Sequence, residues 1–177
     1  MNIEEIHSLL VQNFAQASIP ALETTARDPW IEVAPDAVHE VAVFLRDDER
    51  LRFDHLNDLC GVDYFEPDPA KAAKFAHDPH VEVVYHLTSF ERQHAVKLKV
   101  KLPRWKGGTD GEIPDVPSVA DVWAIAEWHE REAYDLVGVN FVGNPNMRRI
   151  LCPEDWVGHP LRKDYEFPLE YHGIRCK

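Results

Sequence analysis

The chain has 177 residues, of which 45% are apolar and 28% are charged. This length and composition suit one domain with a core plus a modest tail, and they exclude a fibrous or wholly disordered chain. The formal net charge of −12 argues against a nucleic-acid-binding protein, because phosphate neutralisation needs a basic face. No apolar run approaches the ~20 residues that span a bilayer, and the start lacks the basic region of a secretory signal, so we expect no integral membrane protein.

The charges and the cysteines are unevenly placed. Residues 1–143 contain 13 Lys and Arg against 26 Asp and Glu, whereas residues 144–177 contain 6 against 5. The first part therefore has an acidic surface, which mainly keeps a protein soluble, and the end of the chain is locally basic. Cys60, Cys152 and Cys176 are far apart and form no C-x-x-C pair, so we expect reduced thiols and neither a cysteine-ligated iron–sulfur cluster nor a structural zinc.

The beginning of the chain predicts two amphipathic helices on either side of a short strand. Apolar residues at steps of three and four predict a helix over residues 2–17 that stops at Pro20. Residues 30–33 predict a strand. Pro35 then opens a second helix, whose apolar face continues to Leu45.

The middle of the chain predicts buried strands. Residues 51–65 suggest buried extended chain with a break at Gly61. Residues 81–87 and 95–102 predict two clearer strands, and the second alternates strictly between apolar residues and lysines. Its lysines should form a solvated or partner-facing row. The residues between these strands, 88–94, predict a hairpin loop or a longer connection.

Loops and one long helix are expected next. Residues 66–80 predict a surface loop, and the glycines and prolines of residues 103–117 predict irregular chain. A helix is predicted over residues 118–137, with Ser118 as its N-cap and Gly138 after its last turn.

The order of elements predicts an α+β domain over residues 1–141, with two layers: helices packed on one mixed β-sheet. Residues 142–177 have no long periodic stretch and contain prolines about every eight residues, which predicts an extended C-terminal tail. Such a tail cannot bury enough apolar surface by itself to offset its ordering entropy, so we expect it to be mobile in the isolated chain.

Four acids and one arginine lie close together near the end of the predicted long helix. On a helix, Arg131 is four residues from both Glu127 and Asp135, so it can pair with either. Taken alone, this cluster is best explained as an exposed, salt-bridged helix face.

The tail contains basic doublets among aromatic residues. An extended arm with arginine and aromatic side chains is typical of surface that contacts a protein partner, and a tail folded back on its own domain is the alternative. The residues concerned are Arg148 and Arg149, then Arg162 and Lys163, with Trp156, Pro160 and Tyr165.

Four ordered motifs connect the helix end with the tail. They are Glu130-Arg131-Glu132-x-x-Asp135-Leu136-x-Gly138, Phe141-x-Gly143-x-Pro145, Arg148-Arg149-Ile150-Leu151 and Asp155-Trp156-x-Gly158-His159-Pro160-Leu161-Arg162-Lys163-Asp164-Tyr165. Together they resemble the signature of the C-subunit family of the proton-pumping NADH:quinone oxidoreductase, respiratory complex I. The similarity extends upstream, so nearly the whole chain is covered. One position departs: Asn144 stands where the family usually has the histidine of a Gly-His-Pro, and asparagine does not titrate near neutral pH.

The resemblance implies a non-catalytic structural subunit of the hydrophilic arm, which supports electron transfer from NADH to quinone. It implies that FMN and the iron–sulfur clusters are held by partner subunits and that this chain binds no cofactor or metal. The expected partners are the large quinone-site subunit (the D subunit) and neighbouring iron–sulfur subunits, at the cytoplasmic side of the cell membrane. The residues expected at the partner interface are Glu130, Arg131, Glu132, Asp135, Arg148, Arg149, Asp155, Trp156, His159, Arg162, Lys163, Asp164 and Tyr165.

Two other functions stay open. The photosynthetic NADH-dehydrogenase-like complex, cofactor-F420 dehydrogenase and membrane-bound hydrogenases have similar subunits, and the sequence alone does not name the electron donor. A free-standing metal-dependent enzyme is the second alternative, suggested by His77-Asp78-Pro79-His80 and by His129-Glu130, although neither has the spacing of H-E-x-x-H. Cys60 as a nucleophile is less favoured than Cys60 as a small buried side chain.

Overall fold

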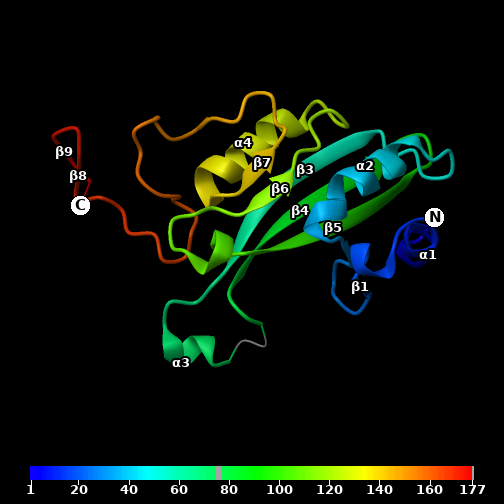
Figure 1. The fold of residues 1–177 in the computed structure, drawn as a ribbon, viewed down its shortest axis with the longest axis horizontal. Helices are drawn as coiled ribbons and strands as arrows, with labels where there is room; N and C mark the ends of the chain where they lie inside the picture. Colours follow the sequence, from blue (N-terminus) through cyan, green and yellow to red (C-terminus); the bar gives the residue numbers. More distant parts are fainter. Residues whose placement is uncertain (75–76, 177) are drawn as a thin grey trace.

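The computed structural model describes residues 1–74 and 77–176, and it has an α+β fold in two layers. A five-stranded mixed sheet has the order β1-β2-β5-β4-β3, and helices cover one of its faces (Figure 1). Within this sheet, β2 and β5 pair in parallel and the other described neighbours pair antiparallel. This confirms the predicted fold class. The strands are β1 (Ala21–Glu23), β2 (Trp30–Glu32), β3 (His55–Tyr64), β4 (His80–Ser89) and β5 (His94–Pro103).

Three helices of ten to twelve residues pack on the sheet: α1 (Ile3–Asn13), α2 (Val38–Asp47) and α4 (Ala126–Val137). A capping box at Asn2 begins α1, which stops at Asn13 instead of continuing to residue 17. The predicted loop over residues 66–80 contains a short helix, α3 (Pro69–Ala72), and residues 75–76 of that loop lie outside the described residues. No helix in the described ranges is long and apolar enough to cross a membrane.

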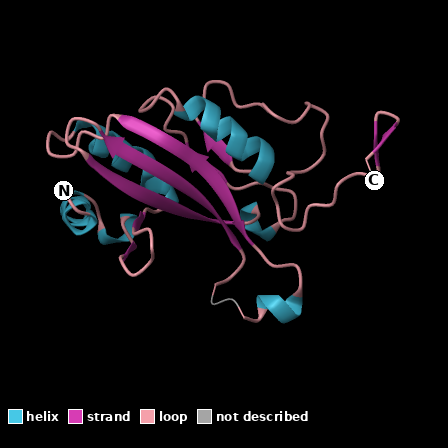
Figure 2. Ribbon diagram, turned by 180° about the vertical axis from the view of Figure 1, so that it is seen from behind, coloured by secondary structure: helices cyan, strands magenta, loops and turns pink. Residues whose placement is uncertain are grey.

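Strand β5 has the alternation that the sequence predicts. Val96, Leu98, Val100 and Leu102 are buried against the helices, in one core with residues of α1, α2 and α4. The lysines of β5 lie on the opposite face of the sheet, which none of the described helices covers (Figure 2). The sequence pattern therefore identifies which face of the sheet is covered.

Gly61 does not break a strand, so that prediction was wrong. β3 continues through it, and Gly61 pairs with Val83 of β4. A Cβ added at Gly61 would lie 3.0 Å from the Cβ of Val137 in α4. The glycine allows α4 to approach the sheet closely, which is the second common reason for glycine in a strand.

β3 is an edge strand, and α4 covers part of its free edge. The backbone N–H of Leu59 donates to Nδ1 of His129, at 3.0 Å. A helix side chain therefore occupies a backbone donor at the edge of the sheet.

The long helix begins later than predicted. Residues 118–125 form turns, and α4 starts at Ala126, because the Ser118 hydroxyl binds the buried Glu130 carboxylate and the Ala120 N–H instead of capping a helix. Gly138 ends α4 in the left-handed conformation, as predicted.

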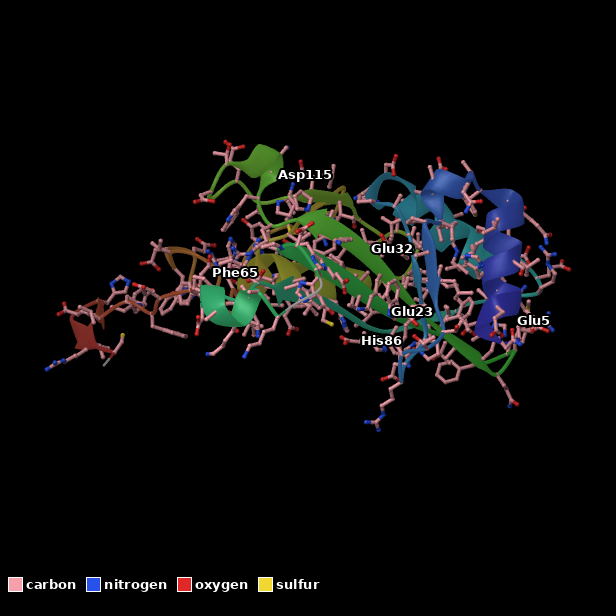
Figure 3. All side chains as sticks on the ribbon, turned by 90° about the horizontal axis from the view of Figure 1, so that it is seen from below. Glu5, Glu23, Glu32, Phe65, His86 and Asp115 are labelled. Carbon is pink, nitrogen blue, oxygen red and sulfur yellow. The ribbon has the colours of Figure 1, made fainter. Side chains whose placement is uncertain are left out.

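Two short strands lie outside the main sheet and position the start of the tail. β6 (Asp115–Pro117), in the segment predicted to be irregular, pairs in parallel with β7 (Asn140–Val142). Figure 3 shows Phe65 at the end of the sheet that lies toward the tail, with Glu5 of α1 at the opposite end. The last pair, β8 (Glu170–Tyr171) and β9 (Ile174–Arg175), forms a hairpin near the C-terminus.

Candidate functional site

Three charged residues of α4 are buried, so the expectation of an exposed, salt-bridged helix face was wrong for them. Glu130 and Asp135 are 0% exposed, and Arg131 is 5% exposed. Arg131 pairs with neither Glu127 nor Asp135, because residues 144–165 lie over the helix and supply other partners. We call residues 144–165 the fastened segment.

Asp135 is the centre of the first group of contacts. Its Oδ2 accepts three consecutive backbone N–H groups, from Ile150 at 3.0 Å and from Leu151 and Cys152 at 2.8 Å. Its Oδ1 accepts from Nη1 of Arg149 at 2.5 Å. Burial alone would raise the pKa of this carboxyl, but the bonds from Cys152, Arg149 and the other amides outweigh it and hold the pKa below its ordinary value. Asp135 is thus a charged, fully bonded group under the chain that it fixes.

Arginines of the fastened segment bind backbone carbonyls of the helix end. Arg149 also donates to Gly158 O at 2.9 Å. Arg162 donates through Nε to Val137 O and through Nη2 to Gly138 O at 3.0 Å, so it satisfies carbonyls that the end of α4 leaves without partners. Burial lowers the pKa of Arg162 to about 10, so it remains charged at neutral pH.

His159 packs directly over the last turn of α4. Its Nδ1 is 3.0 Å from Asp135 O, and a Cβ at Gly138 would lie 2.6 Å from the ring. Gly138 has φ 77°, so both its conformation and its neighbour require glycine. Burial lowers the pKa of His159, which favours the neutral ring at this position.

Arg131 points from α4 to the start of the fastened segment. Its Nε donates to Arg148 O at 3.2 Å and its Nη2 to Arg149 O at 3.3 Å, while its guanidinium lies 5.0 Å from the Trp128 ring. These bonds satisfy backbone carbonyls that no strand or helix pairs.

Glu130 joins three parts of the chain. Its carboxylate accepts from the Ser118 hydroxyl at 2.6 Å, from Val119 N at 2.7 Å and from Nδ2 of Asn144 at 2.7 Å. Burial raises the pKa of Glu130, and these three bonds offset only part of that effect. The residue that departs from the family pattern, Asn144, is therefore a direct partner of a buried acid.

A second group of contacts was not predicted from the sequence. Arg104 binds both oxygens of Asp63 in β3, at 2.8 and 2.9 Å, and both oxygens of Asp164, at 3.1 and 2.7 Å. Asp63 also accepts from Lys163 N at 2.9 Å. The two carboxylates raise the pKa of Arg104 above its ordinary value despite its burial. This group fixes the far end of the fastened segment to the sheet.

Other predicted interface residues face outward. Glu132, Arg148, Asp155 and Lys163 are exposed, and Tyr165 is half-buried with its ring over Gly158. Trp156 is also half-buried and packs against Tyr171, with the ring centroids 5.0 Å apart. The structure describes one chain, so the contact of all thirteen residues with a partner stays a prediction.

Exposed apolar side chains gather on the same part of the chain. Leu151 is 62% exposed, Val157 85%, Leu161 56%, Phe167 51% and Leu169 73%. Their role cannot be predicted from the sequence, because an isolated leucine or valine in a loop has no pattern. They become candidates for an interface only in the structure, where several polar side chains beside them bind the domain.

The histidine and cysteine positions considered for chemistry have structural partners. His80 stacks on Tyr64 with ring centroids 4.7 Å apart, and its Nε2 is 3.3 Å from Glu82. The three cysteines are free, and burial raises the pKa of Cys60 to about 11, which opposes a reactive thiolate. Across residues 1–74 and 77–176, no three His, Cys, Asp or Glu side chains are grouped to hold a metal ion. The absence of a bound cofactor stays a prediction.

Comparisons with known proteins agree with the motifs. The family model described as "Respiratory-chain NADH dehydrogenase, 30 Kd subunit" matches residues 31–171, which include every predicted interface residue. A protein of Chloroherpeton thalassium, named as the C subunit of NADH-quinone oxidoreductase, is 48% identical over 173 residues, which are 97% of this chain but 64% of that relative. The chain thus spans less than two thirds of that protein.

Two further relatives extend the comparison. A protein of Chlorobium phaeobacteroides with the same name is 40% identical, over 96% of this chain and 92% of its own length. A protein of Acidiphilium cryptum is named as the C/D subunit of NADH-quinone oxidoreductase. It is 40% identical over 90% of this chain, which corresponds to 25% of that longer protein.

Proposed function

This chain belongs to the family of the 30 kDa subunit of respiratory-chain NADH dehydrogenase, and from that premise we propose that it is a non-catalytic structural subunit of the hydrophilic arm of a proton-translocating NADH:quinone oxidoreductase. In this role it supports electron transfer from NADH to quinone without a catalytic site of its own. FMN and the iron–sulfur clusters belong to other subunits, and the chain lies peripherally at the cytoplasmic side of the membrane through its complex.

The partner that we propose is the large quinone-site subunit, the D subunit, with iron–sulfur subunits nearby. The relative that is named as a C/D subunit supports this choice, because fusion into one chain requires the two parts to be compatible in one assembly. The share of that relative outside the match is large enough to contain a second subunit.

One observation supports docking through the tail most strongly: three of its charged side chains bind groups of the domain, while large apolar side chains beside them remain exposed. Arg149, Arg162 and Asp164 bind groups of the domain. Val157 and Leu161 beside them face outward. Isolated exposed apolar residues are common, but a run of them on a segment that is held in place by buried polar contacts is typical of an interface. We therefore assign the docking contacts mainly to the apolar side chains, and to the arginines the role of fixing the backbone that presents them.

The test is recovery of the large subunit from native membranes with a tagged chain. The variant Val157→Ser/Leu161→Ser should fold normally, because both side chains are exposed and surface changes usually alter the free energy of unfolding by less than about 0.5 kcal/mol. Each lost apolar contact is worth about 1.5 kcal/mol or more when it is buried in a complex, so recovery of the large subunit should fall at least about tenfold.

Phe90→Ser is the matched control, because Phe90 is 65% exposed and lies in the β4–β5 turn, far from the tail in sequence and position. It should leave recovery unchanged. Recovery at the normal level from the double variant would contradict docking through the fastened segment. Failure of the unaltered chain to bring down any large subunit would contradict the proposed function itself.

A further inference from the structure

A pocket of about 570 Å³ lies where the fastened segment meets the last residues of the chain. We call residues 166–176 the terminal segment. Four aromatic side chains line the pocket: Trp105, Trp156, Tyr165 and Tyr171. Its remaining lining includes Arg162 and the carboxylates of the terminal segment, Glu166 and Glu170.

Two hydrogen-bond donors of the residues that line this pocket have no acceptor within the described part of the chain. They are Nε1 of Trp156 and Nη1 of Arg162, and both atoms are shielded from solvent. Arg162 as a whole is only 5% exposed, and its other nitrogens bind Val137 and Gly138. A buried donor without an acceptor costs roughly 1–3 kcal/mol, so two of them at one pocket favour a ligand that brings an acceptor oxygen.

The charges around the pocket select the kind of acceptor. Asp164 binds Arg104, and Asp155 accepts from Tyr171 and His172. Glu166 and Glu170 are exposed and form no ion pair with any described residue. The negative charges of Glu166 and Glu170 would repel a carboxylate or phosphate ligand. They would not repel a neutral carbonyl group. A basic side chain near the carbonyl would gain from the two acids and from the aromatic faces.

We propose that this pocket binds an extended segment of the partner subunit that contains a lysine or arginine. A backbone carbonyl of that segment accepts from Trp156 Nε1 and Arg162 Nη1. The basic side chain next to it lies against the aromatic lining and faces Glu166 and Glu170. The inference rests on the proposed function, since it assigns a recognition chemistry to the surface that docks there.

The first experiment uses the tagged chain in its native complex and compares three variants. Trp156→Phe keeps an aromatic ring and removes the N–H donor together with the volume of the second ring. Glu166→Gln/Glu170→Gln removes the two free charges and keeps their shape. Glu154→Gln, at an exposed carboxylate that does not line the pocket, is the matched control.

Retention of the partner is measured as the salt concentration rises. Trp156→Phe should weaken retention about tenfold at every salt concentration, because a buried bond is lost. The double glutamine variant should weaken it about fivefold at low salt and little at high salt, because exposed charges are screened. Glu154→Gln should behave as the unaltered chain.

Thermal unfolding of the isolated chain separates binding from folding. Trp156→Phe removes a buried donor that has no acceptor in the free chain, which favours stability, and it removes ring volume from a half-buried side chain, which opposes it. Its melting temperature should therefore change by less than about 4 °C. A larger fall in melting temperature together with weaker retention would assign Trp156 a structural role and overturn the proposal.

The second experiment identifies the occupant. A photo-reactive benzoylphenylalanine replaces Phe167, whose ring packs beside Trp156 and Tyr165. Irradiation of the complex should cross-link a partner segment that contains lysine or arginine. A cross-link to an acidic segment, to this same chain or to no protein overturns the inference, as does full retention by all variants. Because these outcomes presuppose that the large subunit is recovered, they are distinct from failure of the proposed function.

Discussion

The fastened segment and the terminal segment follow each other in the chain but are held in different ways. Side chains and amides of residues 144–165 bind buried groups of α4 and β3, among them Asp135, Glu130 and Asp63. Residues 166–176 form no hydrogen bond or ion pair with residues 1–143 in the described structure, and contact mainly Asp155, Trp156 and Tyr165. The fastened segment contains no helix or strand, and the terminal segment contains the two-residue strands β8 and β9.

The difference shows how a segment without its own core becomes ordered. The fastened segment forms hydrogen bonds with polar groups that are already buried in the domain. Many of these bonds involve a charged group, and such bonds are stronger than bonds between neutral groups. The terminal segment has apolar side chains instead, and those are stabilised only when another surface covers them. The mobility of the tail in the isolated chain stays a prediction, and these contacts favour it for residues 166–176 over residues 144–165.

The largest test of this contrast is Asp135→Asn. The change removes the charge that holds Arg149 and leaves a half-buried guanidinium and three amides with a weaker acceptor. Loss of one partner of a buried ion pair costs about 3–5 kcal/mol, so the free energy of unfolding in urea should fall by about that amount. Glu154→Gln, at an exposed position, should change it by less than about 0.5 kcal/mol.

The pH dependence of this loss has a defined sign. The pKa of Asp135 is lowered in the folded chain, so its carboxylate contributes stability that is present above the ordinary carboxyl pKa and disappears as the pH falls through the folded value. The difference between the unaltered chain and Asp135→Asn should be full at neutral pH and should shrink below about pH 4. A difference that grows on acidification would contradict the assigned role.

Hydrogen exchange on the isolated chain compares the two segments directly. The amides of Ile150, Leu151 and Cys152 bind Asp135 and should exchange on the order of 100-fold more slowly than the amides of Glu166, Phe167 and Leu169. Equal, fast exchange in both segments would show that the fastened segment is not fixed until a partner binds.

Gly138→Ala should have a smaller effect on stability. The alanine backbone would be held in the left-handed conformation, which is unfavourable for it, and its methyl group would collide with the His159 ring. The free energy of unfolding should therefore fall by about 2 kcal/mol. Gly173→Ala is the matched control, with the same φ of 77° and no neighbour within 4 Å. It should not disturb the fastened segment, as judged by the exchange of the Asp135-bound amides.

Asn144→His should have the smallest effect. At neutral pH a histidine donates to Glu130 much as the asparagine does, so stability should change by less than about 1 kcal/mol. A histidine that gains a carboxylate partner has a raised pKa, so its added stability is full below about pH 6.5 and disappears as the pH rises through the folded value. Thermal melts of both chains between about pH 5 and pH 8, where histidine titrates, would measure this effect. The melting temperature of the variant should rise relative to that of the unaltered chain as the pH falls.

Sequence patterns predicted an element correctly where the pattern has a single structural explanation. The alternation in β5 has a single explanation, burial on one side, and the prediction for that strand was confirmed. Gly61 was misread because glycine in a strand has two causes, a break or a close approach, and only the position of Val137 distinguishes them. The late start of α4 depends on a bond from Ser118 to Glu130, twelve residues away, which no local capping rule contains.

The motifs identified the family, but the roles of their residues could not be derived from spacing. Arg149 and Arg162 have the appearance of surface anchors in sequence, because nothing local shows that α4 offers them Asp135 and two terminal carbonyls. The partner of Asp164 is Arg104, sixty residues earlier. Such pairs depend on how the sheet brings the end of β5 beside the tail, which is a property of the fold.

The bond between Leu59 and His129 has a consequence for the time before any partner is met. A free sheet edge is a template on which a strand of another copy can add, and this donor on β3 is already occupied by a helix side chain. Before any partner binds, this part of the β3 edge is therefore less able to pair with a strand of another copy of the chain.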